Sequence, residues 1–206
     1  MRRLLVLLVL AFGSACAAPG PPARGSVAAP LPVNTAETAV APDAMADSML
    51  TDVRSLDSSI VVDMRYATRS NFTGEPLPGY LANRALLRKE AAIRLAGVQS
   101  DLRPQGLGLK VFDSYRPVRA TLAMVDWTAR VKRPDLLADG YIASRSRHNL
   151  GLAIDLSLID LATGNELEMG TSFDTFSAAA HTANANGVAA VNRQRLKSAM
   201  ERRGFA

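Results

Sequence analysis

Two short segments of the chain carry residue types that could do chemistry. In the first, Ser146–Asp155, the imidazole of His148 precedes the carboxylate of Asp155. Imidazole nitrogens and carboxylate oxygens are both ligands that a zinc ion accepts. If Asp155 lies on the open face of a strand that starts just after His148, both groups can point at one ion. The spacing alone also fits a plainer interpretation, in which a packing histidine lies near an aspartate that satisfies backbone groups.

The second segment is Asp113–Pro117, with the sequence Asp-Ser-Tyr-Arg-Pro. It lies where a strand is expected to end and a helix to begin. A guanidinium held at this place, that of Arg116, can stabilise the oxyanion that develops during acyl transfer. The alternative is an ion pair between Asp113 and Arg116 that only braces the turn.

The spacing of apolar residues predicts the elements that must position these groups. Strands are expected over 59–66, 109–113 and 150–159, and helices over 84–103, 117–131 and 192–203, the last of them capped by Gly204. In the strand 150–159, leucines and Ile154 alternate with Asp155, Ser157 and other small residues. One face therefore belongs to the core, and the other leaves room for a ligand. Because strands and helices do not alternate regularly, we expect an α+β fold with a central, mainly antiparallel sheet flanked by helices.

The N-terminus has the pattern of a secretory signal peptide, which we expect to cover residues 1–16. Two arginines precede the apolar run Leu4–Phe12, and small residues follow it through Ala17. The run is too short to span a bilayer. Cys16 stands where bacterial lipoprotein signals place their lipidated residue, so we expect a lipid anchor there, with ordinary cleavage near Ala17 as the alternative. Both alternatives place the protein outside the cytoplasm, in the periplasm or cell envelope.

Composition separates a linker from a folded domain and excludes several classes of partner. Residues 17–46 are rich in Ala and Pro and read as a spacer, whereas 47–206 are expected to fold. The chain has 24 basic and 19 acidic residues, for a formal charge of +5, and the basic residues are scattered, so no nucleic-acid partner is expected. A single cysteine excludes an internal disulfide and a cysteine-rich metal site. The only membrane contact expected is the lipid on Cys16.

Several blocks of the sequence together resemble the zinc D-alanyl-D-alanine dipeptidases of the vancomycin-resistance type. The Ser-x-His-x-x-Gly-x-Ala-x-Asp pattern of 146–155 and the Asp-Ser-Tyr-Arg-Pro of 113–117 match two blocks of that family. The further matching blocks are Met64–Thr68, Asn71–Gly74, Met169–Asp174, and Asn192–Arg193 with Met200 and Gly204–Phe205. The blocks occur in order from about residue 52 to the last residue, so the resemblance is far more specific than either motif alone.

The resemblance implies an α+β metallopeptidase that hydrolyses D-Ala-D-Ala to free D-alanine. One zinc ion per chain would be held by three protein ligands, among them His148 and Asp155, with water or substrate in the fourth position. A glutamate would act as general base and then as acid, and Arg116 would stabilise the tetrahedral oxyanion. Two rival functions fit the same residues: a zinc peptidase that trims peptidoglycan stem peptides, and a non-catalytic envelope protein that binds D-Ala-containing peptides through Arg116.

The family supplies its general base and its third zinc ligand from a Glu-Trp-Trp-His-like segment that follows the Gly-Phe after the last helix. In this sequence Gly204–Phe205 is followed by Ala206, and no Glu-x-x-His occurs. We therefore expect the chain as given to be incomplete at its C-terminal end, so that the base and the third ligand are missing from it. His181 is not expected to replace the ligand, and Glu166 and Glu168 are not expected to replace the base.

Overall fold

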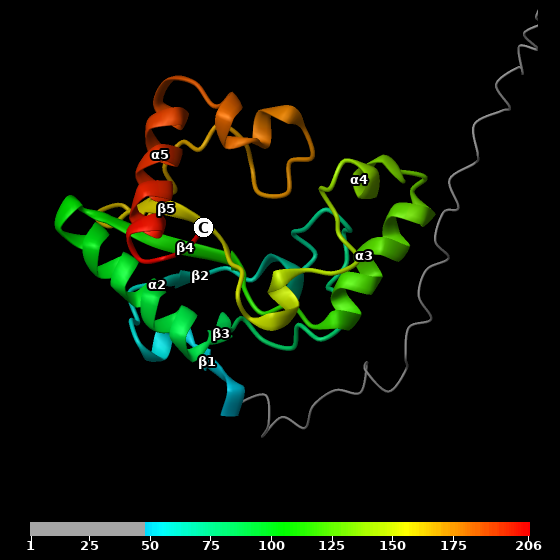
Figure 1. Ribbon diagram of the computed structural model, residues 1–206, viewed down its shortest axis with the longest axis horizontal. Helices are drawn as coiled ribbons and strands as arrows, with labels where there is room; N and C mark the ends of the chain where they lie inside the picture. The colour runs from blue at the N-terminus through cyan, green and yellow to red at the C-terminus, as the bar shows by residue number, and fades with distance from the viewer. Residues whose placement is uncertain (1–47) are drawn as a thin grey trace, which may run out of the picture. The chain divides into compact units, whose positions relative to one another are not determined.

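A three-stranded sheet forms the centre of the fold in the computed structural model, which describes residues 48–206 (Figure 1). The strands are β2 (Val61–Val62), β4 (Leu107–Asp113) and β5 (Asp155–Asp160), in the order β2-β4-β5. β4 is antiparallel to β5 and parallel to β2. A separate antiparallel pair joins β1 (Leu50–Asp52) to β3 (Leu86–Arg88). The segments expected to be a signal peptide and a linker, and Cys16 with them, lie outside the described residues.

Helices α2 (Lys89–Leu102) and α5 (Gly187–Arg202) pack on one face of the central sheet (Figure 1). Helices α3 (Val118–Arg130) and α4 (Asp135–Ala138) lie beyond the end of β4 (Figure 1). None of the helices in residues 48–206 is long and apolar enough to cross a membrane.

The buried apolar side chains form two clusters. The first joins the central sheet to α2 and α5, with Leu95 of α2, Leu109 of β4 and Leu158 of β5 fully buried in it. The second lies around α3 and α4 and is rich in aromatic residues. Tyr80 packs against both clusters, so it lies where the two meet.

The sequence predicted the fold class correctly, and the sheet is mainly antiparallel as expected. The expected strand over 59–66 is much shorter, because it pairs with β4 only at Val61 and Val62 and then turns. The helix expected over 84–103 begins at Lys89. The preceding residues are held extended, since the Leu86 N–H donates to the Ser114 hydroxyl and the Leu86 carbonyl accepts from the Tyr115 N–H.

The strand expected from Leu150 begins only at Asp155, and this prediction was wrong in its first part. Residues Arg147–Leu150 form a single 3-10 turn that ends at Gly151 in the left-handed conformation, with a φ of 65°. A Cβ atom at position 151 would lie 3.1 Å from the Arg88 backbone nitrogen, which donates to the Gly151 carbonyl. Leu150 and Leu152 are therefore 52% and 46% exposed rather than part of the core.

Within β5 the expected alternation holds where the strand pairs with β4. Leu158 lies opposite Leu109 in the core, whereas Ser157 lies opposite Lys110 on the other face. A register irregularity between Val111 and Asp113 then brings the last residue of β4 opposite Asp155, the first residue of β5. The sheet thus places the two aspartates beside each other at one end.

Gln99 of α2 holds β4 through a buried hydrogen bond, and its contribution to stability can be measured. Its side chain is fully buried, accepts a hydrogen bond from the Leu109 N–H at 2.8 Å and donates to the Ser59 hydroxyl at 3.0 Å. Replacing Gln99 with Leu leaves the Leu109 N–H without this acceptor, so we expect the free energy of unfolding in urea to fall by about 2 kcal/mol. The exposed Gln105→Leu variant serves as the control, with an expected change within about 0.5 kcal/mol. Equal stabilities of the two variants would contradict this account.

Candidate metal centre

His148 and Asp155 lie together, as the sequence predicted. The Nε2 atom of His148 is 3.5 Å from the Oδ1 atom of Asp155. Zinc holds such atoms at about 2.1 Å in a tetrahedron, which separates two ligand atoms by about 3.4 Å. The pair therefore fits two ligands of one zinc ion.

The orientation of His148 is fixed by the backbone that follows β4. Its Nδ1 atom donates to the Ser114 carbonyl at 2.8 Å, which leaves the lone pair of Nε2 facing Asp155. The turn around His148 is itself tied down by a capping box. The Ser146 hydroxyl accepts from the His148 N–H, and the Asn149 side chain accepts from the Ser146 N–H. A histidine held in this way can bind a metal without first losing rotamer freedom.

The carboxylate of Asp113 lies against His148, and so supports His148 and Asp155, which we call the metal pair. It is fully buried and accepts hydrogen bonds from the Tyr80 hydroxyl, the Ser114 N–H and both Nε and Nη2 of Arg116, the last two at 2.9 and 2.6 Å. Burial raises the pKa of Asp113, and the charges of Arg116 and His148 oppose that rise. Donors surround the carboxylate on all sides, an arrangement that matches its ionised form.

The position of Arg116 is compatible with both interpretations of its segment, the ion pair that braces the turn and the cation beside a reacting group. It forms the ion pair with Asp113 that would brace the turn, and its Nη2 atom also lies 3.8 Å from Oδ2 of Asp155. Burial alone would lower the pKa of Arg116, but the charge and hydrogen bonds of Asp113, together with Tyr66 and Tyr80, outweigh burial and raise the pKa, so the guanidinium stays charged. Its Cζ atom lies 5.2 Å from the centre of the Tyr66 ring. The cation is thus held on three sides next to the metal pair.

Asp113, His148 and Asp155 form a group in residues 48–206 whose potential ligand atoms all lie within 4.8 Å of one another. Asp113 is better assigned as a support than as a third ligand, because its Oδ2 atom faces Nδ1 of His148 at 3.3 Å and its oxygens are taken by the donors described above. Burial lowers the pKa of His148, but the nearby carboxylates of Asp155 and Asp113 outweigh it and raise the pKa. The same negative charge would attract a cation in place of the proton.

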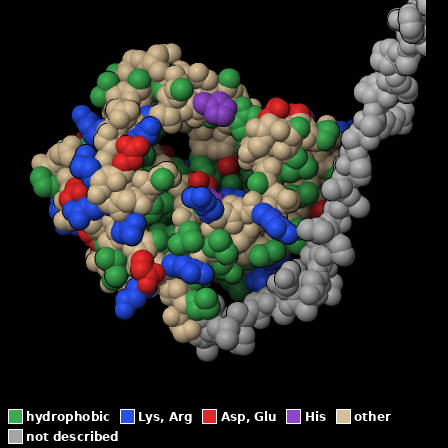
Figure 2. Space-filling view, viewed as in Figure 1, with side chains coloured by type: hydrophobic (Ala, Val, Ile, Leu, Met, Phe, Trp, Pro, Cys, Tyr) green, Lys and Arg blue, Asp and Glu red, His purple; other side chains and the backbone are tan. Residues whose placement is uncertain are grey.

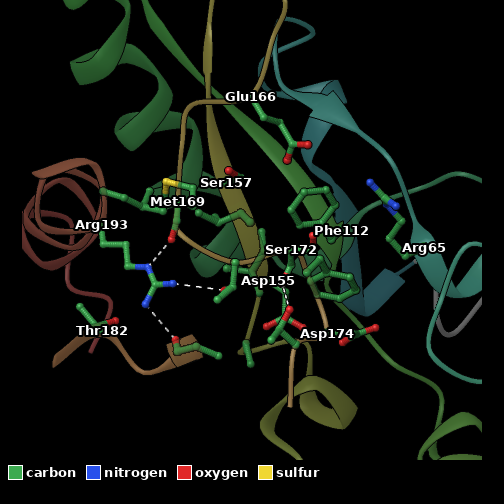
Figure 3. A pocket seen from close by; sticks show the side chains of 18 of the residues that line it. Arg65, Phe112, Asp155, Ser157, Glu166, Met169, Ser172, Asp174, Thr182 and Arg193 are labelled. Carbon is green, nitrogen blue, oxygen red and sulfur yellow. Dashed lines mark hydrogen bonds between the residues drawn. The ribbon is translucent and has the colours of Figure 1, made fainter. Parts of the chain in front are cut away.

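A cavity of about 1520 Å³ is lined in part by Asp155, one of the two residues of the metal pair. Figure 2 shows it as a hollow in this face of the molecule, with charged side chains inside. Its walls come from the loop 65–72, from β5, from the segment 166–176 and from α5. The face of β5 that carries Ser157 and Asp155 forms part of the wall, as the small side chains on that face of the strand had indicated (Figure 3).

Asp174 is a pocket residue to which the sequence analysis gave no role. Its Oδ1 atom accepts from the Tyr66 hydroxyl at 2.9 Å, whereas Oδ2 is buried without a hydrogen-bond partner among residues 48–206. Burial raises the pKa of Asp174 to about 7, and the negative charge of Asp155 adds to the rise. Figure 3 shows both aspartates in the same part of the pocket. An acidic residue between Phe173 and Thr175 was visible in the sequence, but its burial was not.

The three residues considered as substitutes do not join the metal pair. His181 is exposed, and its Nε2 atom lies 3.4 Å from the Tyr141 hydroxyl. Glu168 accepts from the Gly170 N–H at 2.6 Å, and Glu166 pairs with Lys110 at 3.5 Å. None of the three belongs to the group of potential metal ligands found in residues 48–206.

A histidine and an aspartate placed to fit one zinc ion, beside a fixed arginine in an α+β fold, form an arrangement that suits a metal-dependent hydrolase. The chain matches the model of the D-Ala-D-Ala dipeptidase family over residues 46–206. A D-alanyl-D-alanine dipeptidase of Enterococcus faecium is 40% identical over 159 residues, which cover 69% of this chain and 78% of that relative. One of Streptomyces coelicolor is 35% identical over 169 residues, covering 75% and 84%. The chain therefore belongs to the D-Ala-D-Ala dipeptidase family, which is a family of zinc peptidases.

The two histidines of the chain give a matched test of the metal centre. Replacing His148 with Ala removes one of the two candidate ligands, so we expect the zinc that the parent protein retains after dialysis against zinc to fall to near zero in the variant. The His181→Ala variant should keep its zinc, because the His181 ring pairs with Tyr141 and is not part of the group of potential metal ligands found in residues 48–206. Metal analysis by atomic emission measures both. Unchanged zinc in the His148 variant would show that the ion binds elsewhere.

Proposed function

We propose that the chain acts on the dipeptide D-Ala-D-Ala and hydrolyses it to two molecules of D-alanine with the help of one zinc ion. The observation that carries the proposal is the His148–Asp155 pair with Arg116 beside it, in a chain whose relatives are named D-alanyl-D-alanine dipeptidases. Zinc bound by this pair would polarise the amide carbonyl and activate a water molecule.

Arg116 is the residue of this chain that would stabilise the charge that develops on the substrate oxygen. Its guanidinium is held by Asp113 through two hydrogen bonds, so it does not have to reorganise when the charge appears. One of its nitrogens already faces the metal pair, at 3.8 Å from Asp155. A lysine would keep the charge at this position but would lose the two-pronged contact with Asp113.

Asp174 is suited to bind the ammonium group of a free dipeptide. Its Oδ2 atom is buried at the pocket wall and lacks a hydrogen-bond partner within the described part of the chain. A buried carboxylate without a partner costs free energy, and an ammonium group bound there would remove that cost. This contact would favour a dipeptide with a free N-terminus over longer or blocked peptides.

A second function, the binding of D-Ala-containing peptides, needs neither a general base nor a third zinc ligand. Within residues 48–206, no glutamate and no second histidine lie at the metal pair. Hydrolysis needs a general base, whereas binding needs only the pocket, Arg116 and Asp174. The alternative function is therefore the binding of D-Ala-containing peptides without turnover.

Turnover of D-Ala-D-Ala by the full chain with zinc supplied tests the proposal directly. We expect D-alanine release that falls by a factor of about 100 to 1,000 in kcat when Arg116 is replaced with Lys, since a transition-state donor is displaced. The exposed Arg130→Lys variant is the control and should keep its kcat. If the folded, zinc-loaded chain binds the dipeptide but releases no D-alanine, the binding function replaces the catalytic one.

Asp174→Asn tests recognition of the substrate amine. The variant keeps the shape of the side chain but loses its charge, so we expect the Kd for D-Ala-D-Ala to rise about 10- to 100-fold by calorimetry. The Kd for N-acetyl-D-Ala-D-Ala should stay the same, because that ligand has no ammonium group. The Asp126→Asn variant on the exposed side of α3 controls for the change in net charge. Equal losses for the two ligands would rule out an ammonium contact.

A further inference from the structure

One segment, which we call the pocket loop (residues 169–181), forms the wall that carries Asp174. Its regular structure is limited to the 3-10 turn Ala178–Ala180. Two aromatic contacts fasten its middle, where Phe173 stacks on Phe112 at 4.9 Å and Phe176 packs edge-on against Phe72 at 5.0 Å. Asp174 itself has a φ of 60°, in the left-handed region that residues other than glycine adopt uncommonly and that aspartate adopts more often than most.

Both ends of the pocket loop are held by a single side chain of α5, that of Arg193. At the start of the loop, its Nε donates to the Met169 carbonyl at 2.6 Å and its Nη2 to the Thr171 hydroxyl at 3.2 Å. At the end of the loop, its Nη1 lies 3.0 to 3.2 Å from three carbonyls, those of Ala179, Ala180 and His181. Figure 3 shows the guanidinium between these two parts of the chain. Arg193 therefore joins the two ends of the pocket loop, and we call this set of hydrogen bonds the clasp.

The environment of Arg193 is unlike that of a surface arginine. The residue is 9% exposed, and none of the ion pairs found in residues 48–206 includes it. Its charge is met by carbonyl dipoles that come from two separated stretches of backbone, a pattern that only the planar, five-donor guanidinium can satisfy. Gly170 allows the approach, because a Cβ atom there would lie 3.0 Å from the Ala189 Cβ and 3.3 Å from the Arg193 Nη2 atom.

We propose that Arg193 is a positioning residue of the substrate pocket, which fixes both ends of the pocket loop and thereby holds the Asp174 carboxylate at the pocket wall. The proposal rests on the role proposed for Asp174 in binding the substrate amine. Arg193 lines the pocket, but in this proposal its effect on affinity passes through the loop and not through contact with the substrate.

Hydrogen exchange of the full chain, followed by mass spectrometry, tests the clasp without any ligand. Arg193→Lys keeps the charge but cannot reach both ends of the loop, so we expect amides of the pocket loop such as Ala180 and His181 to exchange about tenfold faster while those of β4 do not change. The exposed Arg195→Lys variant of the same helix should exchange like the parent.

Thr171→Val, which removes one acceptor and leaves Arg193 intact, should give a smaller change in the same amides. Unchanged exchange of the loop in Arg193→Lys overturns the proposal.

A double-mutant cycle then tests whether Arg193 acts through Asp174. In the parent chain, Arg193→Lys should raise the Kd for D-Ala-D-Ala about tenfold, and in the Asp174→Asn background it should change the Kd less than about twofold. Equal fold-losses in both backgrounds would overturn the positioning role, because Arg193 would then act independently of Asp174. If the parent chain binds no D-Ala-D-Ala, the proposed function fails, and exchange of the loop still decides whether Arg193 is the clasp.

Discussion

The burial of the Asp113 carboxylate is the constraint on which the rest of the site depends. A buried charge is strongly unfavourable unless donors surround it. Tyr80, Ser114 and Arg116 supply these donors, and His148 lies against the same carboxylate. Satisfying one buried group therefore fixes the positions of the Arg116 guanidinium and the His148 imidazole next to Asp155.

The fold brings these residues together by joining the end of one strand to the start of its antiparallel neighbour. Asp113 ends β4 and Asp155 begins β5, and an irregular register between the two strands places them opposite each other. Asp155 is therefore a member of the metal pair, whereas Asp113 lies against His148 from the other side of its ring. The turn that carries His148 is anchored to both sides, since the Asn149 amide donates to the Arg116 carbonyl and the Gly151 carbonyl accepts from Arg88. The metal pair thus depends on backbone contacts as much as on its own side chains.

The sequence predicted the parts of the molecule that local patterns encode. His148, Asp155 and Arg116 were identified from motifs, and the helix after Pro117 from its apolar spacing. The start of β5 was misplaced because the alternation of leucines continues into a turn that only tertiary contacts with Arg88 explain. The roles proposed for Asp174 and Arg193 were not predicted for a related reason: they rest on contacts between segments distant in the chain, which local spacing does not encode.

Tyr80 packs against both hydrophobic clusters and donates its hydroxyl to Asp113. Neither cluster can loosen alone without moving this ring and admitting water to the buried carboxylate. The free energy of opening one cluster therefore includes part of the cost of opening the other, and the domain gains cooperativity from a residue that supports the candidate metal centre. A chain of this design would lose its metal pair and its tertiary structure in a single transition.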